Sequence, residues 1–126
     1  MSGGGINRIL VIDHEPDLRN SYDRLLRRQG YRVVTAGSRA EGLRLVIEPP
    51  RLVISDLRLP DGDGLDIIRA AKAIHPPVPV IVVTSFASAA SRRAARASGA
   101  AAFLTKPFSA SELLELVRIE FERPLS

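Results

Sequence analysis

Several residue types that define common kinds of functional site are scarce or missing from this chain. Its 126 residues include no cysteine, no tryptophan and two histidines, and aromatic residues make up 5%. The lack of cysteine excludes disulfide scaffolds, thiol catalysis and cysteine zinc sites, and two histidines cannot complete a three-histidine zinc site. The net charge of +4 comes from arginines spread along the chain, which favours solvated helix faces over a nucleic-acid surface.

Long hydrophobic runs are also missing. No apolar run approaches the roughly 20 residues that a membrane helix needs, and the glycine-rich start lacks the pattern of a signal peptide. The length and the ordinary shares of hydrophobic (45%) and charged (25%) residues suit one domain. We expect a flexible N-terminal tail at 1–6, a domain over 7–123, a C-terminal tail or linker start at 124–126, and a cytoplasmic location.

Short apolar runs alternate along the chain with segments of helical pattern. Continuous runs predict strands at 9–12, 32–35, 52–55, 79–83 and 101–104. Helices are predicted from Pro16 to a stop at Gly30, from a capping box at 38–41 to the prolines at 49–50, at 65–74, at 88–98, and from a capping box at 109–112. Because strands without polar alternation are buried on both faces, the pattern predicts an α/β fold with a parallel sheet between helices.

A polar residue follows most of these strands at the point where the strand ends. Asp13 follows the first strand, Asp56 the third, Thr84 the fourth and Lys106 the fifth. A single residue of this kind is usually a turn former or a helix cap. Because the carboxyl ends of parallel strands meet at one edge of a sheet, four such residues are expected to converge on one crevice.

These groups together suit phosphoryl transfer. One carboxylate can act as the nucleophile, and a second carboxylate with backbone oxygens can hold Mg²⁺. The cation would neutralise phosphoryl oxygens, while an ammonium group and a hydroxyl contact the others.

Four motifs make the chain resemble the response-regulator receiver domains of two-component signalling, over roughly 7–122. They are ILVIDHEPDL at 9–18, DLRLPDGDGL at 56–65, VVTS at 82–85 and FLTKPF at 103–108. The resemblance implies a flavodoxin-like parallel sheet of five strands in the order 2-1-3-4-5, with five helices in a three-layer α/β/α sandwich. It also implies a phosphorylation switch that catalyses its own modification, rather than an ordinary enzyme.

The resemblance assigns roles to the residues at the strand ends. Asp56 is similar to the family's phospho-acceptor, Lys106 to its phosphate-contacting lysine and Thr84 to its switch hydroxyl. Asp13, Asp56 and the backbone carbonyl of Arg58 are expected to hold Mg²⁺.

Two further family features fall near the fifth strand. Phe103 takes the aromatic switch position, although it lacks the hydroxyl of the commoner tyrosine, and a plain core phenylalanine is an equally good interpretation. The family also implies a cis peptide bond between Lys106 and Pro107.

His14 is the main departure from the family pattern, which has two adjacent acids after the first strand. Imidazole is a poorer Mg²⁺ ligand than carboxylate, so one reading is a weakened or altered metal site in which Mn²⁺ competes better than usual. A second reading is a solvated histidine beside a site that works through Asp13, Asp56 and water. A third is that Glu15 or Asp61 supplies the missing oxygen through water.

The resemblance also implies partners. A sensor histidine kinase or a phosphotransfer protein would donate the phosphoryl group, a DNA-binding or other output domain could lie outside this chain, and no membrane contact is expected. A homodimer through the fourth and fifth helices is suggested by Arg92, Arg93 and Arg96 on one and Glu112, Glu115 and Glu122 on the other. The alternative function is a receiver-like interaction module that works without phosphorylation.

Overall fold

The computed structural model describes residues 7–123, so the predicted tails at 1–6 and 124–126 lie outside the described residues. Strands and helices alternate as expected, with one added pair of short strands. The elements are β1 (Arg8–Ile12), α1 (Pro16–Arg28), β2 (Arg32–Ala36), α2 (Arg39–Leu45), β3 (Leu52–Asp56), β4 (Arg58–Leu59), β5 (Gly62–Asp63), α3 (Leu65–Ile74), β6 (Val80–Thr84), α4 (Ala89–Ser98), β7 (Ala102–Thr105) and α5 (Ala110–Glu122).

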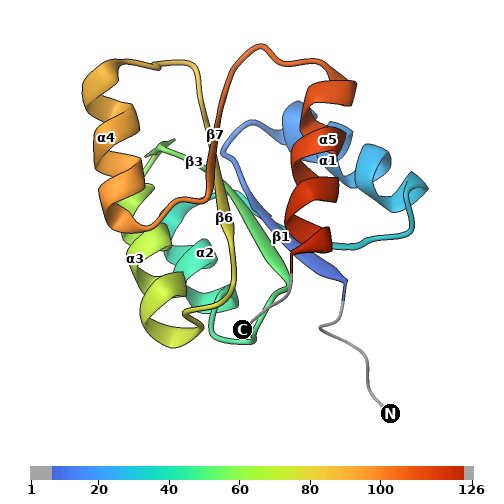
Figure 1. Cartoon of the computed structure of the whole chain (residues 1–126), viewed down its shortest axis with the longest axis horizontal. Helices are drawn as coiled ribbons and strands as arrows, with labels where there is room; N and C mark the ends of the chain where they lie inside the picture. The colour runs from blue at the N-terminus through green and yellow to red at the C-terminus, as the bar shows by residue number, and fades with distance from the viewer. Residues whose placement is uncertain (1–6, 124–126) are drawn as a thin grey trace.

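The main sheet has five parallel strands in the order β2-β1-β3-β6-β7, which confirms the predicted topology. Helices α1 and α5 cover one face, and α2, α3 and α4 cover the other (Figure 1). The chain reverses its direction of strand addition between β1 and β3. Sites in sheets of this kind lie where the strand order reverses, at the carboxyl ends of the strands.

Every residue of β1, β3 and β6 is buried, as continuous apolar strands require. Alternate side chains enter two hydrophobic clusters, one on each face. On one face Leu10 packs with Ile67 of α3. On the other, Ile9 packs with Leu26 of α1 and Leu113 of α5. Each fully buried side chain of this size stabilises the fold by about 1.5–3 kcal/mol, so the central strands are held firmly at the site edge.

Helix boundaries differ from the predicted ones mainly at α2. This helix ends at Leu45, ahead of the prolines at 49–50 that were expected to stop it. Val46, its buried C-cap, still donates its N–H to the carbonyl of Gly42. Glu48 precedes Pro49, a position that disfavours helical backbone, so the helix cannot continue to the prolines. None of the described helices is long and apolar enough to cross a membrane.

Helix starts follow the predicted caps with one change. The box at Ser109 and Glu112 is complete, since each side chain bonds to the other's backbone N–H. At α2, Ser38 accepts a hydrogen bond from the Glu41 N–H, but the Glu41 carboxylate accepts the N–H of Gly37 at 2.8 Å instead of that of Ser38. The predicted box at 38–41 is therefore only half formed.

The segment 58–63, where the sequence predicts neither a strand nor a helix, contains the β4–β5 pair. Arg58 pairs with Asp63 and Leu59 with Gly62 in antiparallel register. Two-residue strands carry too little hydrophobic pattern to be recognised in a sequence. The pair leads the chain from the end of β3 into α3, beside the candidate site.

Candidate functional site

Asp13, Asp56 and Thr84 lie buried at the carboxyl ends of adjacent strands. Their exposed fractions are 1%, 6% and 1%. Asp13 directly follows β1, while Asp56 ends β3 and pairs in register with Val83, the residue before Thr84 on β6. The structure thus brings together the residues that sequence reasoning placed at this edge.

Lys106 joins the two aspartates. Its Nζ donates hydrogen bonds to Asp13 Oδ2 at 2.7 Å and to Asp56 Oδ2 at 2.9 Å. A third bond reaches Glu15 Oε1 at 3.1 Å. The lysine side chain is 9% exposed, and the following peptide bond to Pro107 is cis, as the resemblance implied.

The environment of Lys106 pulls its pKa in two directions. Burial alone would lower the pKa, but the hydrogen bonds and negative charges of Asp13 and Asp56 outweigh it, so the net pKa is raised. The ammonium group is therefore fully charged at neutral pH. One ammonium group pairs with two buried carboxylates, so it does not balance their negative charge and a further cation would be attracted to this site.

Tyr22 of α1 also lies near these charges, which its place in the helical pattern did not reveal. Burial, followed by the negative charges of Asp13, Asp56 and Glu15, raises the pKa of its phenol. Tyr22 lines a cavity of about 690 Å³ between α1 and the start of α5, with Lys106 and Phe108 in the same wall. The phenol stays neutral beside the acidic site.

Backbone groups hold each carboxylate in place. Asp13 Oδ1 accepts the N–H of Glu15 at 2.9 Å, and Asp56 Oδ1 accepts the N–H of Arg58 at 3.2 Å. Gly64 lets the start of α3 approach the end of β3, because a Cβ there would overlap the backbone carbonyl oxygen of Asp56. In the sequence, Gly64 is only one residue of the motif at 56–65, with no sign of this contact.

The two predicted switch residues occupy different surroundings. Thr84 Oγ1 accepts the N–H of Phe86 at 3.1 Å, which ties the hydroxyl to the loop between β6 and α4. Phe103, on β7, is partly buried against the core cluster that includes Val82. The guanidinium of Arg92 lies over the Phe103 ring, 4.5 Å from its centroid.

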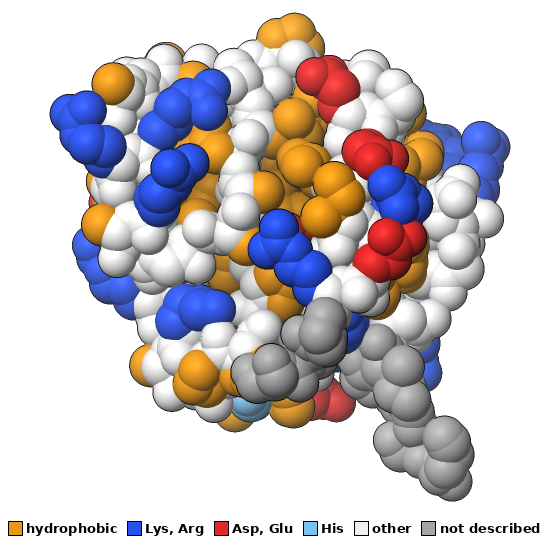
Figure 2. Space-filling view, in the orientation of Figure 1, with side chains coloured by type: hydrophobic (Ala, Val, Ile, Leu, Met, Phe, Trp, Pro, Cys, Tyr) orange, Lys and Arg blue, Asp and Glu red, His pale blue; other side chains and the backbone are white. Residues whose placement is uncertain are grey.

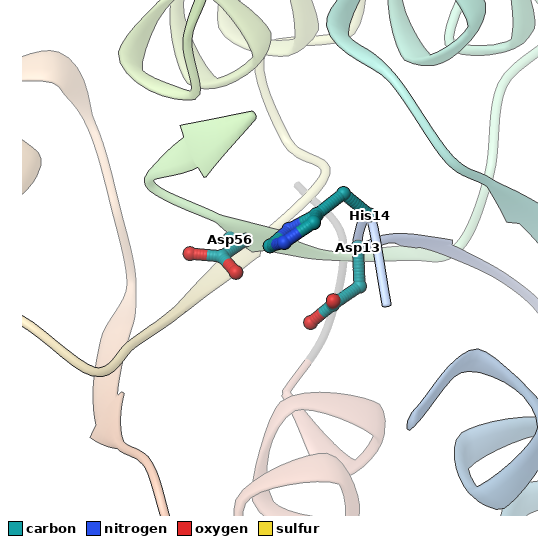
Figure 3. A group of neighbouring side chains, drawn as sticks. All are labelled: Asp13, His14 and Asp56. Carbon is teal, nitrogen blue, oxygen red and sulfur yellow. The ribbon is translucent and has the colours of Figure 1, made fainter. Parts of the chain in front are cut away.

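A cation could be held between the two aspartates and His14. Asp13, His14 and Asp56 each offer a ligand atom, and these atoms all lie within 4.8 Å of one another. The His14 ring extends from the loop after β1 toward the carboxylate of Asp56 (Figure 3). Two carboxylates and one imidazole are a donor set that divalent metals accept, so the residues present fit a metal ion.

The two acids proposed to replace the missing carboxylate are engaged elsewhere. Asp61 accepts the N–H groups of Arg39 at 2.7 Å and Ala40 at 2.9 Å, at the start of α2. These bonds lower the pKa of the Asp61 carboxyl. Glu15 pairs with Lys106, and neither Glu15 nor Asp61 belongs to the group of ligand atoms within 4.8 Å of one another that Asp13, His14 and Asp56 form.

An aromatic–cation pair lies on the loops beside the site and had no signal in the sequence. The Arg58 guanidinium lies over the ring of Phe86, 4.1 Å from its centroid. Phe86 is 58% exposed. The pair links the segment after β3 with the loop after β6, next to the ends of the strands that carry Asp56 and Thr84.

Known proteins resemble the chain both in sequence and in structure. Residues 9–118 match the family model of the response regulator receiver domain. The chain is 38% identical over 110 residues to transcriptional regulatory protein GlrR of Escherichia coli K12. This match covers 86% of this chain and 25% of GlrR. It is 36% identical over 117 residues to transcriptional regulatory protein PrrA of Mycobacterium tuberculosis, covering 92% and 50% of the two chains.

Among solved structures, the beryllofluoride-activated NtrC4 receiver domain dimer matches with a TM-score of 0.86 and 33% identity. The match covers 92% of this chain and 97% of that one. The chain thus spans a quarter to a half of the two curated relatives, and nearly the whole of an isolated receiver domain. From its sequence match and its fold, the chain belongs to the response regulator receiver domain family.

Proposed function

We propose that Asp56 accepts a phosphoryl group from the phosphohistidine of a sensor histidine kinase or a phosphotransfer protein. The observation that carries the proposal is the position of Lys106 Nζ, within 3 Å of both Asp13 and Asp56 at the carboxyl ends of adjacent parallel strands. This arrangement places a nucleophile, a metal-site acid and a fixed ammonium group around one point.

In the transfer step, a carboxylate oxygen of Asp56 attacks the phosphorus atom and a new P–O bond forms. The P–N bond to the donor histidine breaks, and its electron pair stays on the imidazole nitrogen. Lys106 Nζ bonds to Asp56 Oδ2 before the transfer. When this oxygen becomes part of the acyl phosphate, Lys106 is placed to turn its ammonium group to a phosphoryl oxygen. The N–H of Arg58 holds the other Asp56 oxygen during the attack.

A divalent cation held by Asp13, Asp56 and the backbone carbonyl of Arg58 would supply positive charge to the phosphoryl oxygens. Asp13 is fixed for this role by the N–H of Glu15. Among residues 7–123, Lys106 is the one basic side chain that pairs with Asp13 or Asp56, so their two carboxylates can attract such an ion.

The switch would run through Thr84 and Phe103. The Thr84 hydroxyl accepts the N–H of Phe86, and it can also donate its own proton. A phosphoryl oxygen on Asp56 would give that proton a charged acceptor. Moving Thr84 would alter the β6–α4 loop and the space beside Phe103. The surface near α4 and β7 would then change for a partner.

The second candidate is an interaction module that works without phosphorylation, and His14 is the observation that favours it. The test is intact mass after treatment with a small acyl phosphate. With excess Mg²⁺ we expect a gain of one phosphoryl group, and with a chelator we expect that gain to be lost. No gain at any Mg²⁺ concentration would favour the second candidate.

We further propose that α4, β7 and α5 form a homodimer face and that an output domain belongs to the longer protein. Exposed Arg93 and Arg96 lie on α4 and exposed Glu112 on α5. Basic side chains gather over α4 and acidic ones over α5, with apolar atoms between them (Figure 2). The NtrC4 receiver domain, similar in sequence, is a dimer in its beryllofluoride-activated form. Glu115 and Glu122 already pair with Arg118, so they contribute less charge to a partner.

Sedimentation with a beryllofluoride phosphate mimic tests this face. We expect the mimic to produce a dimer, and Arg96→Glu to weaken that dimer by reversing one charge on α4. Arg24→Glu on α1, also exposed and outside the α4–β7–α5 face, is the matched control and should dimerise normally. A wild-type chain that stays monomeric at both low and high salt contradicts the proposed face.

A further inference from the structure

His14 comes directly after Asp13, in the loop that follows β1, and its side chain is free to bind. The residue is exposed, and no hydrogen bond or ion pair of its side chain occurs within residues 7–123. Figure 3 shows its imidazole turned toward the carboxylate of Asp56, with the carboxylate of Asp13 below the ring in this view. The ligand atoms of the three residues lie within 4.8 Å of one another, so a small closure would bring them around one ion.

No nearby acid makes up for the carboxylate that His14 replaces. Asp61 bonds to the first N–H groups of α2 and Glu15 to Lys106, and neither offers an oxygen to the group of ligand atoms within 4.8 Å that Asp13, His14 and Asp56 form. Asp63 Oδ1 accepts the N–H of Leu65 at the start of α3. In the part of the chain that the structure describes, the side chains placed to bind one cation at this edge are therefore two carboxylates and one imidazole.

The two carboxylates keep acceptor capacity for an ion. Asp13 and Asp56 each give one oxygen to Lys106 and the other to a backbone N–H. A carboxylate has about four lone-pair positions, so each oxygen can still accept one more partner. Lys106 need not leave before a cation enters.

The chemistry of this donor set separates metals. Mg²⁺ demands near-octahedral oxygen ligands, and imidazole is a poor substitute for one of them. Zn²⁺ accepts histidine nitrogen and aspartate oxygen at about 2.0–2.2 Å, and Mn²⁺ tolerates nitrogen better than Mg²⁺ does. Replacing an oxygen ligand by nitrogen thus lowers affinity for Mg²⁺ and raises it for first-row transition metals.

We propose that His14 is a direct nitrogen ligand and that it shifts the selectivity of this site from Mg²⁺ toward first-row transition-metal dications, Zn²⁺ and Mn²⁺. The proposal deepens the proposed function, because the same site would assist transfer to Asp56. Metal binding needs no phosphoryl donor, so it can be measured separately from phosphorylation. The ratio of the affinities for Zn²⁺ and Mg²⁺ is the decisive quantity, since carboxylates alone also favour Zn²⁺ somewhat.

Calorimetric titration of the metal-free full chain with Zn²⁺, Mn²⁺ or Mg²⁺ salts tests the selectivity. In His14→Asp we expect the ratio of Zn²⁺ to Mg²⁺ affinity to fall about tenfold or more, in line with the cost of losing a group that serves a metal site. His75→Gln removes the other histidine, which lies at the end of α3 and bonds to the carbonyl of Ile47. That control should keep the wild-type ratio.

The imidazole signals of His14 in the wild-type NMR spectrum give a second readout that needs no variant. Zn²⁺ should shift them at one equivalent, and Mn²⁺ should broaden them before those of His75. An unchanged affinity ratio in His14→Asp, or His14 signals that stay unmoved at saturating Zn²⁺, would overturn the proposal. If phosphorylation fails while these signals move, the proposed function is wrong and the metal site stands.

Discussion

Asp56→Asn is expected to abolish phosphorylation by a small acyl phosphate. The amide cannot act as the nucleophile, and Asp56 is the aspartate that ends the central strand β3 within reach of Lys106. The fold should survive, because the amide still offers an oxygen to Lys106 and the Asp13–Lys106 pair remains. Intact mass after treatment with the donor measures the effect.

Asp17→Asn is the matched control for this variant. Asp17 lies in the first turn of α1, where it is exposed and close in sequence to the site. Its side chain forms no ion pair with Lys106, the partner of Asp13 and Asp56. It should gain a phosphoryl group as the wild type does. A mass gain in Asp56→Asn equal to that of the control would remove Asp56 from the mechanism.

Lys106→Met is expected to harm both stability and phosphorylation. Methionine keeps much of the side-chain volume but leaves the buried carboxylates of Asp13 and Asp56 without their shared cation. Breaking a buried ion pair in this way costs about 3–5 kcal/mol of unfolding free energy. Loss of one preorganised donor to the phosphoryl oxygens should slow phosphorylation by about 10²–10³-fold.

The stability difference has a defined dependence on pH. Because the pKa of Lys106 is raised in the folded protein, its stabilising effect is fully present below the ordinary lysine pKa of 10.5. It is lost as pH rises through the raised value, so wild type and variant should converge in strong alkali. Denaturant unfolding at pH 7 and at a series of pH values rising from 10.5 measures how the stability difference narrows.

Lys72→Met serves as the control, since Lys72 and Lys106 are the two lysines of the chain. Lys72 Nζ donates to the carbonyl of Val78 at 3.1 Å, far from the site edge. Its loss should cost about 1 kcal/mol, with no effect on phosphorylation. Equal stability losses in the two variants would mean that the buried carboxylates do not depend on Lys106.

The parts of the site that follow from strand order could be predicted from the sequence. Asp13, Asp56 and Thr84 each end an apolar run, and a parallel sheet brings such ends together whatever the loops do. Lys106 follows the last strand in the same way. The prediction that these side chains converge therefore needed only the local patterns and the rule that the carboxyl ends of parallel strands meet at one edge of the sheet.

Contacts between loops distant in the sequence could not be predicted. Asp61 caps α2 through residues 21 and 22 positions earlier, and nothing in an Asp-Gly turn indicates that partner. Arg58 and Phe86 meet only because β3 and β6 are neighbours. Such contacts depend on loop paths, for which hydrophobic periodicity carries no information.

Buried charge away from the site was also missed. Arg51 Nη2 donates to the carbonyls of Glu120, Phe121 and Arg123 at 3.0 Å, and its guanidinium lies 4.7 Å from the centre of the Phe121 ring. In the sequence it is one arginine after two prolines, with no feature that separates it from a solvated one. Its role depends on α5 ending beside the start of β3, which only the packed structure reveals.

The identity of the phosphorylated atom is tested most directly by chemical mapping. Borohydride reduces an acyl phosphate to an alcohol, so a phosphorylated aspartate becomes homoserine and can be located by peptide mass spectrometry. After treatment with the acyl phosphate and Mg²⁺, we expect homoserine at position 56 and at no other aspartate. Homoserine at position 13 or elsewhere, with position 56 unchanged, would contradict the account.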